Sequence, residues 1–178
     1  MALKATIFKA RIQIADMDRE YYGEHHLTLA RHPSETDERM MIRLLAFAHN
    51  AHEQLEFTRG LSSDDEADLW RHSLSGEIEQ WIEVGVPADD RVRKACNRAR
   101  AVRVYAYGQR TAPVWWQKMA SVCERFDNLE VCFLPADACA ALAQLADRSM
   151  DLSVTIQDGH IWVSSDKHNV EIVPETWK

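Results

Sequence analysis

Two acidic side chains, Asp68 and Glu83, have the chemical type and the spacing that a divalent-cation site would use. Residues 77–84, which end just after Glu83, contain the β-branched and aromatic residues of a strand. Successive side chains of a strand point to opposite faces, so Glu79, Trp81 and Glu83 share one face. Magnesium and manganese are held mainly by carboxylate, carbonyl and water oxygens. Asp68, on the preceding strand, could supply a second carboxylate beside Glu83.

The same carboxylates have two simpler explanations, an exposed sheet face or ordinary ion pairs with the arginines that follow. The chain carries a net charge of -7, which argues against non-specific coating of nucleic acid. Residues 91–103 nevertheless contain no acid, so they indicate either a basic patch or a solvated helix face neutralised by neighbouring carboxylates. The basic residues of this stretch are Arg91, Arg93, Lys94, Arg98, Arg100 and Arg103.

The elements that would position these residues alternate between strands and helices. Strands are predicted at residues 3–14, 21–30, 77–84, 102–107, 129–134, 152–156 and 161–165. Helices are predicted at residues 35–57, from Asp89 or Asp90 onward, at 114–126 and at 136–150. Such alternation is typical of a mixed sheet flanked by helices. We therefore expect a single α/β domain over residues 1–178, with a mixed central sheet and a β-hairpin at each end of the chain.

Length and composition agree with a cytoplasmic protein that has a sizeable core. The chain has 178 residues, of which 46% are hydrophobic, a length usual for one domain. No uncharged apolar run reaches the roughly 18 residues of a membrane helix, and no leader peptide is recognisable at the start. The four cysteines form no C-x-x-C pair, so we expect free thiols rather than a zinc site or disulfides.

Other residues that invite a chemical interpretation do not support one. His52-Glu53 begins like a metalloprotease motif, but Glu56 stands where that motif has its second histidine. Trp115 and Trp116 could stack on bases, although tryptophan at a helix start more often packs against a core. The sequence also has no glycine-rich phosphate loop and no nucleophile elbow.

Several segments spread over essentially the full chain resemble the YaeQ family. Its fold resembles the PD-(D/E)XK superfamily of restriction-endonuclease-like, metal-dependent nucleases. The resemblance therefore implies a restriction-endonuclease-like fold and hydrolysis of phosphodiester bonds with Mg or Mn. The segments that carry the resemblance are Asp68-Leu69-Trp70, Gly76-Glu77-Ile78, Trp81-Ile82-Glu83-Val84-Gly85, Arg91-Val92-Arg93-Lys94-Ala95-Cys96, Val114-Trp115-Trp116, Asp127-Asn128-Leu129, Arg148-Ser149-Met150 and Ile156-Gln157-Asp158-Gly159.

The resemblance assigns roles to particular residues. In that superfamily an Asp and the acid of an E-x-K tripeptide bind the cation, and the lysine positions or activates the attacking water. Asp68 matches the Asp and Glu83 matches the second acid, but Gly85 occupies the lysine position. Some members carry the lysine on the adjacent helix, which would make Lys94 the catalytic substitute. At 100° per residue, however, Lys94 points nearly opposite the apolar stripe that begins with Val92.

Further candidates complete the expected site. Arg91, Arg93 and Arg98 are the expected contacts to nucleic-acid phosphates, and Glu38 and Glu79 are the possible additional acids. The missing lysine keeps a second function open, a binding module that has the nuclease fold without catalysis and acts in transcription or protein assembly. Its partner would be a nucleic acid or a protein, and no membrane is expected to be involved.

Overall fold

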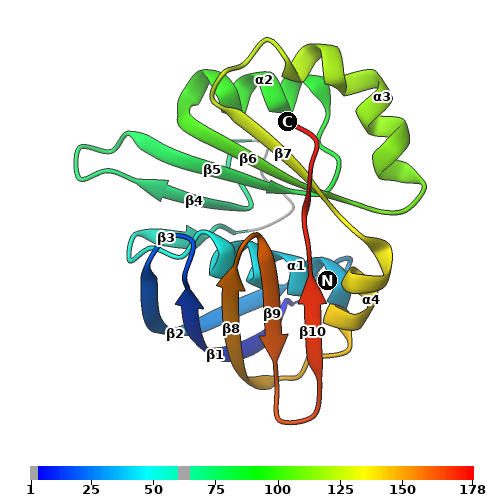
Figure 1. The fold of residues 1–178 in the computed structure, drawn as a ribbon. Helices are drawn as coiled ribbons and strands as arrows, with labels where there is room; N and C mark the ends of the chain where they lie inside the picture. The colour runs from blue at the N-terminus through cyan, green and yellow to red at the C-terminus, as the bar shows by residue number, and fades with distance from the viewer. Residues whose placement is uncertain (1–3, 60–64) are drawn as a thin grey trace. The chain divides into compact units, whose positions relative to one another are not determined.

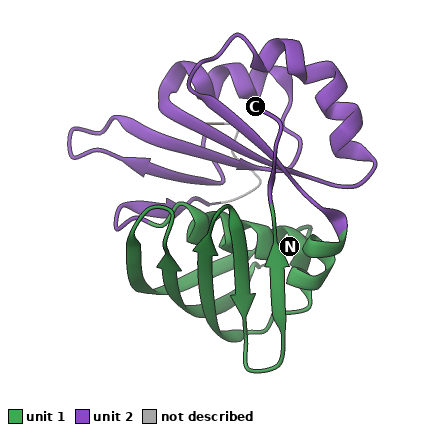
Figure 2. Cartoon of the chain, in the orientation of Figure 1, with its two compact units in different colours: residues 1–51, 137–173 green, residues 52–136, 174–178 purple. Residues whose placement is uncertain are grey.

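The computed structural model describes residues 4–59 and 65–178, which pack as two compact units (Figure 2). The first unit contains the chain up to Ala51 and residues Asp137–Val173. The second contains residues His52–Ala136 and the C-terminal Pro174–Lys178. The chain therefore leaves the first unit after Ala51, returns to it at Asp137 and leaves it again after Val173.

A five-stranded mixed sheet forms the first unit, with the strand order β10-β9-β8-β1-β2 (Figure 1). β1 pairs antiparallel with β2 and parallel with β8, although their sequences lie far apart. Alternate side chains of β1 and β8 are buried, as expected for a sheet that has one face in the core. The strands are β1 (Thr6–Asp16), β2 (Tyr21–Arg31), β8 (Ser149–Gln157), β9 (His160–Ser164) and β10 (Asn169–Ile172).

Helix α1 (Asp37–His49) belongs to the first unit and is shorter than the predicted helix over residues 35–57. It begins at Thr36, whose side chain accepts the N–H of Arg39 at 3.1 Å. It ends at Asn50, whose side-chain amide donates to the carbonyl of Ala46 at 2.7 Å. Residues beyond this point form strand β3 (Leu55–Phe57), so the prediction was wrong there. The apolar spacing continues past the helix because Leu55 is buried by strand pairing instead.

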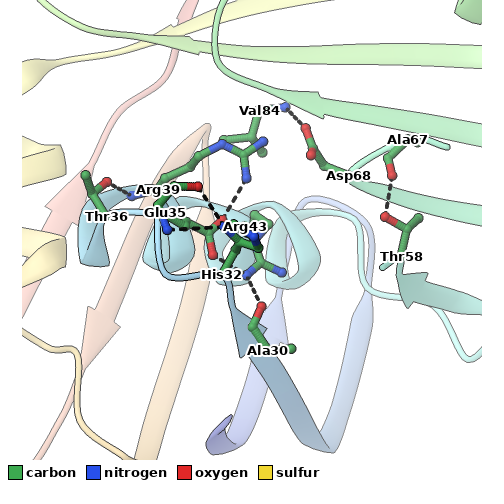
Figure 3. Close-up of polar contacts among 11 residues, drawn as sticks. Ala30, His32, Glu35, Thr36, Arg39, Arg43, Thr58, Ala67, Asp68 and Val84 are labelled. Carbon is green, nitrogen blue, oxygen red and sulfur yellow. Dashed lines mark hydrogen bonds and ion pairs between the residues drawn. The ribbon is translucent and has the colours of Figure 1, made fainter. Parts of the chain in front are cut away.

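A buried ion cluster anchors α1 (Figure 3). Arg43 donates from Nε and Nη2 to the carboxylate of Glu35, at 2.9 and 2.7 Å. Arg39 donates to the same carboxylate at 2.7 Å, and Arg43 also donates to the carbonyl of Ala30 at 3.1 Å. These contacts connect the helix to the end of β2 with charge-assisted hydrogen bonds.

The second unit contains a six-stranded mixed sheet in the order β11-β7-β6-β5-β4-β3. β3, β4 and β5 are antiparallel neighbours, whereas β5, β6 and β7 run parallel. Helices α2 (Asp89–Arg98) and α3 (Thr111–Cys123) contribute Val92, Ala95 and Met119 to the core that buries Trp81. The remaining strands are β4 (Leu69–His72), β5 (Ile78–Val84), β6 (Ala99–Tyr107), β7 (Leu129–Leu134) and β11 (Glu175–Thr176).

The prediction of a mixed α/β protein is confirmed, and so are the hairpins at both ends, but two mixed sheets replace the single central one. β8 and β9 turn at Asp158 and Gly159, both with positive φ. Helix α4 (Ala136–Ala143) stops well before the predicted end at 150, because residues from Ser149 onward pair with β1. None of the helices in the described residues has the length and apolar character needed to cross a membrane.

Candidate functional site

Asp68 and Glu83 come together in the second unit, as their spacing predicts. The ladder between β4 and β5 pairs Leu69 with Ile82, so Asp68, directly before β4, comes beside Glu83. The Asp68 carboxylate accepts the backbone N–H of Val84 at 2.8 Å (Figure 3). Asp68 is 6% exposed and Glu83 is 4% exposed. Both acids are therefore buried, where an ionised carboxylate needs a compensating partner.

Two cationic or polar donors meet at one oxygen of Glu83. Trp81, on the same face of β5, donates its indole N–H to Oε1 at 2.7 Å. Nη2 of Arg91, in the first turn of α2, lies 2.8 Å from the same oxygen. Nη2 of Arg91 also donates to the carbonyl of Glu66 at 2.6 Å. Ion pairing with a following arginine, the simpler explanation from sequence, is thus what the structure shows for Glu83.

Burial, as the larger cause, and the negative charge of Asp68 together raise the pKa of Glu83 to about 7. The hydrogen bond and charge of Arg91 and the hydrogen bond from Trp81 oppose this rise in the pKa. Near neutral pH, part of the Glu83 carboxyl groups therefore hold a proton. Arg91 and this proton together compensate most of the negative charge of the acid pair.

Gly85, which stands where the superfamily pattern has its lysine, has a backbone conformation that residues with a Cβ rarely adopt. Gly85 has a φ of +116°, and its N–H donates to the carbonyl of Tyr105 at 2.9 Å. A Cβ added at Gly85 would meet no atom within 4 Å. Backbone strain, rather than lack of space, therefore disfavours a lysine here.

Lys94, the expected substitute, forms an ion pair with the carboxylate of Asp65. Its side chain is 38% exposed, in agreement with the predicted position off the apolar stripe. Arg98 donates to the carbonyl of Asp65 at 2.9 Å, and its guanidinium lies 5.4 Å from the centre of the Trp81 ring. The α2 side chain that pairs with Glu83 is Arg91, so the geometry does not support a catalytic role for Lys94.

The rest of the basic run is also engaged with acceptors. Arg93 pairs with Asp89 on its own helix. Arg100 lies 3.4 Å from Glu77 and 3.7 Å from Glu79, which places Glu79 in a surface ion pair. Arg103 donates to Glu130 on the neighbouring strand at 2.9 Å. These contacts correspond to the neutralised face that the sequence left open as the alternative to a basic patch.

Arg103 lies on the sheet face opposite to Glu83, and Glu38 belongs to the first unit. In β6, Val102 and Val104 belong to the core beneath the helices, so Arg103 between them points to the other face of the sheet. Glu38 lies in the first turn of α1, which belongs to the first unit.

The residues around the acid pair do not fit a magnesium or manganese ion. Two carboxylates are suitable ligands in type, since Mg²⁺ is often held by one or two of them and by water. However, Oε1 of Glu83 already accepts from a guanidinium and an indole. Across residues 4–59 and 65–178, no group of three or more His, Cys, Asp or Glu side chains is arranged to hold a metal.

Sequence reasoning missed Trp81 as a hydrogen-bond donor, and it did not single out Arg91 among the arginines that could form ion pairs. The signal for Trp81 was available, because it precedes Glu83 by two residues and so shares its face. By name, Arg91 is predicted only as a phosphate contact, although it is one of the arginines that could pair with the carboxylates. Its position directly after the turn at Gly85 and Pro87 is the feature that brings it back to the end of β5.

The family resemblance is confirmed by comparison with known proteins. The sequence model of the YaeQ protein family matches residues 1–174. The uncharacterized protein YaeQ of Escherichia coli (strain K12) is 49% identical over 178 residues, which cover 100% of this chain and 98% of that protein. The YaeQ protein of Salmonella typhi shows the same identity and coverage. The chain therefore belongs to the YaeQ family.

Solved structures of the family have the same fold. The crystal structure of YaeQ from Xanthomonas axonopodis pv. citri matches with a TM-score of 0.95 and 49% identity, covering 98% of both chains. That of YaeQ from Pseudomonas syringae matches with a TM-score of 0.93 and 36% identity, covering 98% of this chain and 96% of the other.

Proposed function

We propose that this chain is a non-catalytic binding protein whose second unit has a nuclease-like core. The observation that carries the proposal is the Arg91 guanidinium on Oε1 of Glu83, at 2.8 Å. In a catalytic centre of the PD-(D/E)XK type this acid binds a metal ion, and a lysine stands two residues later or on the adjacent helix. Here the acid is paired with an arginine, and Gly85 takes the place of the lysine.

The arrangement of elements supports the nuclease-like part of the proposal. β4 and β5 are adjacent antiparallel strands that bring Asp68 and Glu83 together, and α2 connects β5 to the parallel strand β6. A mixed sheet flanked by helices, with paired acids on neighbouring strands, is what the resemblance to restriction-endonuclease-like proteins implies.

Charge balance supports the non-catalytic part. A buried pair of ionised carboxylates is strongly unfavourable unless cations or protons compensate it. Arg91 supplies one positive charge, and the raised pKa of Glu83 lets it hold a proton near neutral pH. The pair is thus stable in the folded protein without a metal ion.

A protein is the partner that the charges favour over a nucleic acid. Phosphate backbones are bound through several available Lys or Arg side chains. In this unit, Arg91, Arg93 and Lys94 pair with carboxylates, and the chain has a net charge of -7. A module of this kind would act in transcription or protein assembly.

A weak metal-dependent nuclease is the second candidate, and the close approach of Asp68 and Glu83 is the observation that favours it. In this alternative Arg91 would leave Glu83, and the two acids would hold Mg or Mn. The metal would polarise the phosphodiester and lower the pKa of its bound water.

A cleavage assay separates the two candidates. The full chain is incubated with labelled single- and double-stranded DNA and RNA, each with Mg²⁺ or Mn²⁺. We expect no cleavage above that of buffer alone. Metal-dependent cleavage that is lost in Glu83→Gln and retained in Glu77→Gln would overturn the proposal. Glu77 is the matched control because it is an exposed acid close to the same strand, and its ion pair is with Arg100.

A salt titration tests the choice of partner. We expect no measurable affinity for any of the same nucleic acids at about 0.15 M salt. A protein whose Lys and Arg side chains are available to contact phosphates still binds at this salt concentration. Affinity that falls linearly with the logarithm of salt concentration, and that weakens in Arg93→Ala or Arg98→Ala, would make nucleic acid the partner.

A further inference from the structure

We propose that Arg91 takes the place of a divalent cation at the Asp68–Glu83 pair and thereby keeps metal ions out. This inference rests on the proposed non-catalytic function and adds to it the residue that prevents metal binding. Asp68 and Glu83 are acids of the kind that bind metal ions, but the groups that contact Glu83 are a guanidinium and an indole.

The guanidinium of Arg91 is held from two sides. Its Nη2 atom lies 2.8 Å from Oε1 of Glu83 and 2.6 Å from the carbonyl oxygen of Glu66. The Arg91 side chain is only 22% exposed, so most of it packs against the protein. A guanidinium is planar, so it loses little side-chain entropy for each hydrogen bond that it forms, and it stays charged at every physiological pH.

The positive charge of Arg91 lies at the carboxylate that a metal ion would also need. A metal that binds Glu83 would share this carboxylate with the Arg91 guanidinium and the Trp81 indole, which both contact Oε1. Two cations at one buried carboxylate repel each other strongly, because screening by water is weak there. Arg91 therefore opposes metal binding by charge as well as by occupancy.

Removing the guanidinium should reverse this effect. Arg91→Ala leaves two buried carboxylates without their positive partner and leaves space where the guanidinium was. Oxygen ligands of this kind accept Mn²⁺ and Mg²⁺, with water completing the coordination. We expect Arg91→Ala to bind one Mn²⁺ per chain at least tenfold more tightly than the wild-type protein.

The experiment measures Mn²⁺ binding to the full chain by electron paramagnetic resonance and by the metal-induced shift in melting temperature. The proteins compared are wild type, Glu83→Gln, Arg91→Ala, Arg91→Ala combined with Glu83→Gln, and Arg93→Ala. Arg93 is the matched control, since it lies on the same helix and pairs with Asp89 instead of Glu83. We expect a saturable Mn²⁺ site and an upward melting shift in Arg91→Ala only.

The contradicting results are distinct. A folded Arg91→Ala variant with no more Mn²⁺ affinity than wild type overturns the inference and leaves the non-catalytic proposal standing. A wild-type protein that binds one Mn²⁺, with loss of binding in Glu83→Gln, overturns both. If Arg91→Ala does not fold, Arg91→Gln is used, because it keeps a polar side chain and removes the charge. We expect Arg91→Gln to bind Mn²⁺ at least tenfold more tightly than the wild-type protein, and the absence of this gain contradicts the inference.

Discussion

The Asp68 carboxylate accepts a hydrogen bond from the backbone N–H of Val84, the residue that follows Glu83 in β5. This bond holds the Asp68 side chain against the strand that carries Glu83. The negative charge of Asp68 consequently contributes to the raised pKa of Glu83. Asp68→Asn keeps an oxygen that can accept the Val84 N–H and removes the negative charge. We predict that the pKa of Glu83 falls below about 7 in this variant.

The pKa of Glu83 can be followed by a carbon NMR titration of its labelled carboxyl group. Asp65→Asn is the control, since Asp65 is an exposed acid that pairs with Lys94. An unchanged Glu83 pKa in Asp68→Asn would show that the two acids are not coupled in solution.

Glu83 should also make stability depend on pH. Its pKa is raised from 4.5 to about 7 on folding, so the folded state binds more protons than the unfolded state between these values. This contribution is most favourable below about pH 4.5, declines as the pH rises through this window, and levels off above it. The expected decline is on the order of 2–4 kcal/mol.

Urea denaturation between pH 5 and 8 measures this dependence, and Glu83→Gln should flatten it. A variant with the same pH dependence as the wild type would contradict the assignment of the titration to Glu83.

Gly85→Ala and Gly85→Lys should destabilise the protein by similar amounts, about 1–3 kcal/mol, because the cause is the positive φ and not the size of the side chain. Gly85→Lys restores the E-x-K spacing, but we predict no metal-dependent cleavage from it while Arg91 pairs with Glu83. Chemical denaturation and the cleavage assay check the two parts. A Gly85→Lys variant as stable as the wild type would contradict the claim that the positive φ strains a residue with a Cβ at this position.

Arg43→Ala should be among the most destabilising substitutions in the first unit. It removes three donated hydrogen bonds and one charge from a buried cluster with Glu35, for which losses of about 3–5 kcal/mol are typical. Lys94→Ala is the control, because its ion pair with Asp65 is exposed and such pairs contribute little to stability. Equal effects of the two substitutions on the free energy of unfolding would contradict this ranking.

The sequence predicted the features that depend on local pattern. Strand alternation placed Trp81 and Glu83 on one face, and Asp158-Gly159 located the C-terminal hairpin. Helix ends were less predictable, because the apolar spacing continued through Leu55, whose burial comes from strand pairing. The division into two sheets depends on the parallel pairing of β1 with β8, which neither strand encodes alone.

The sequence predicted the two acids of the candidate site but did not single out Arg91 as the basic side chain that pairs with Glu83. The approach of Asp68 to Glu83 follows from their places on neighbouring strands, which the sequence predicts, and the structure shows these strands to be antiparallel. The choice of Arg91 over Lys94 depends on the turn at Gly85 and on the direction of α2, which charge counts and helical periodicity do not determine.

Crystals of the wild-type protein grown with Mn²⁺ test the central claim most directly. Anomalous scattering from manganese locates the metal without reference to activity. We predict no manganese peak within about 2.5 Å of the Asp68 or Glu83 carboxylate oxygens, the range of cation–oxygen ligand distances, and Arg91 still paired with Glu83. A peak ligated by both carboxylates, with the Arg91 guanidinium displaced, would contradict the claim that this acid pair is closed to metal ions.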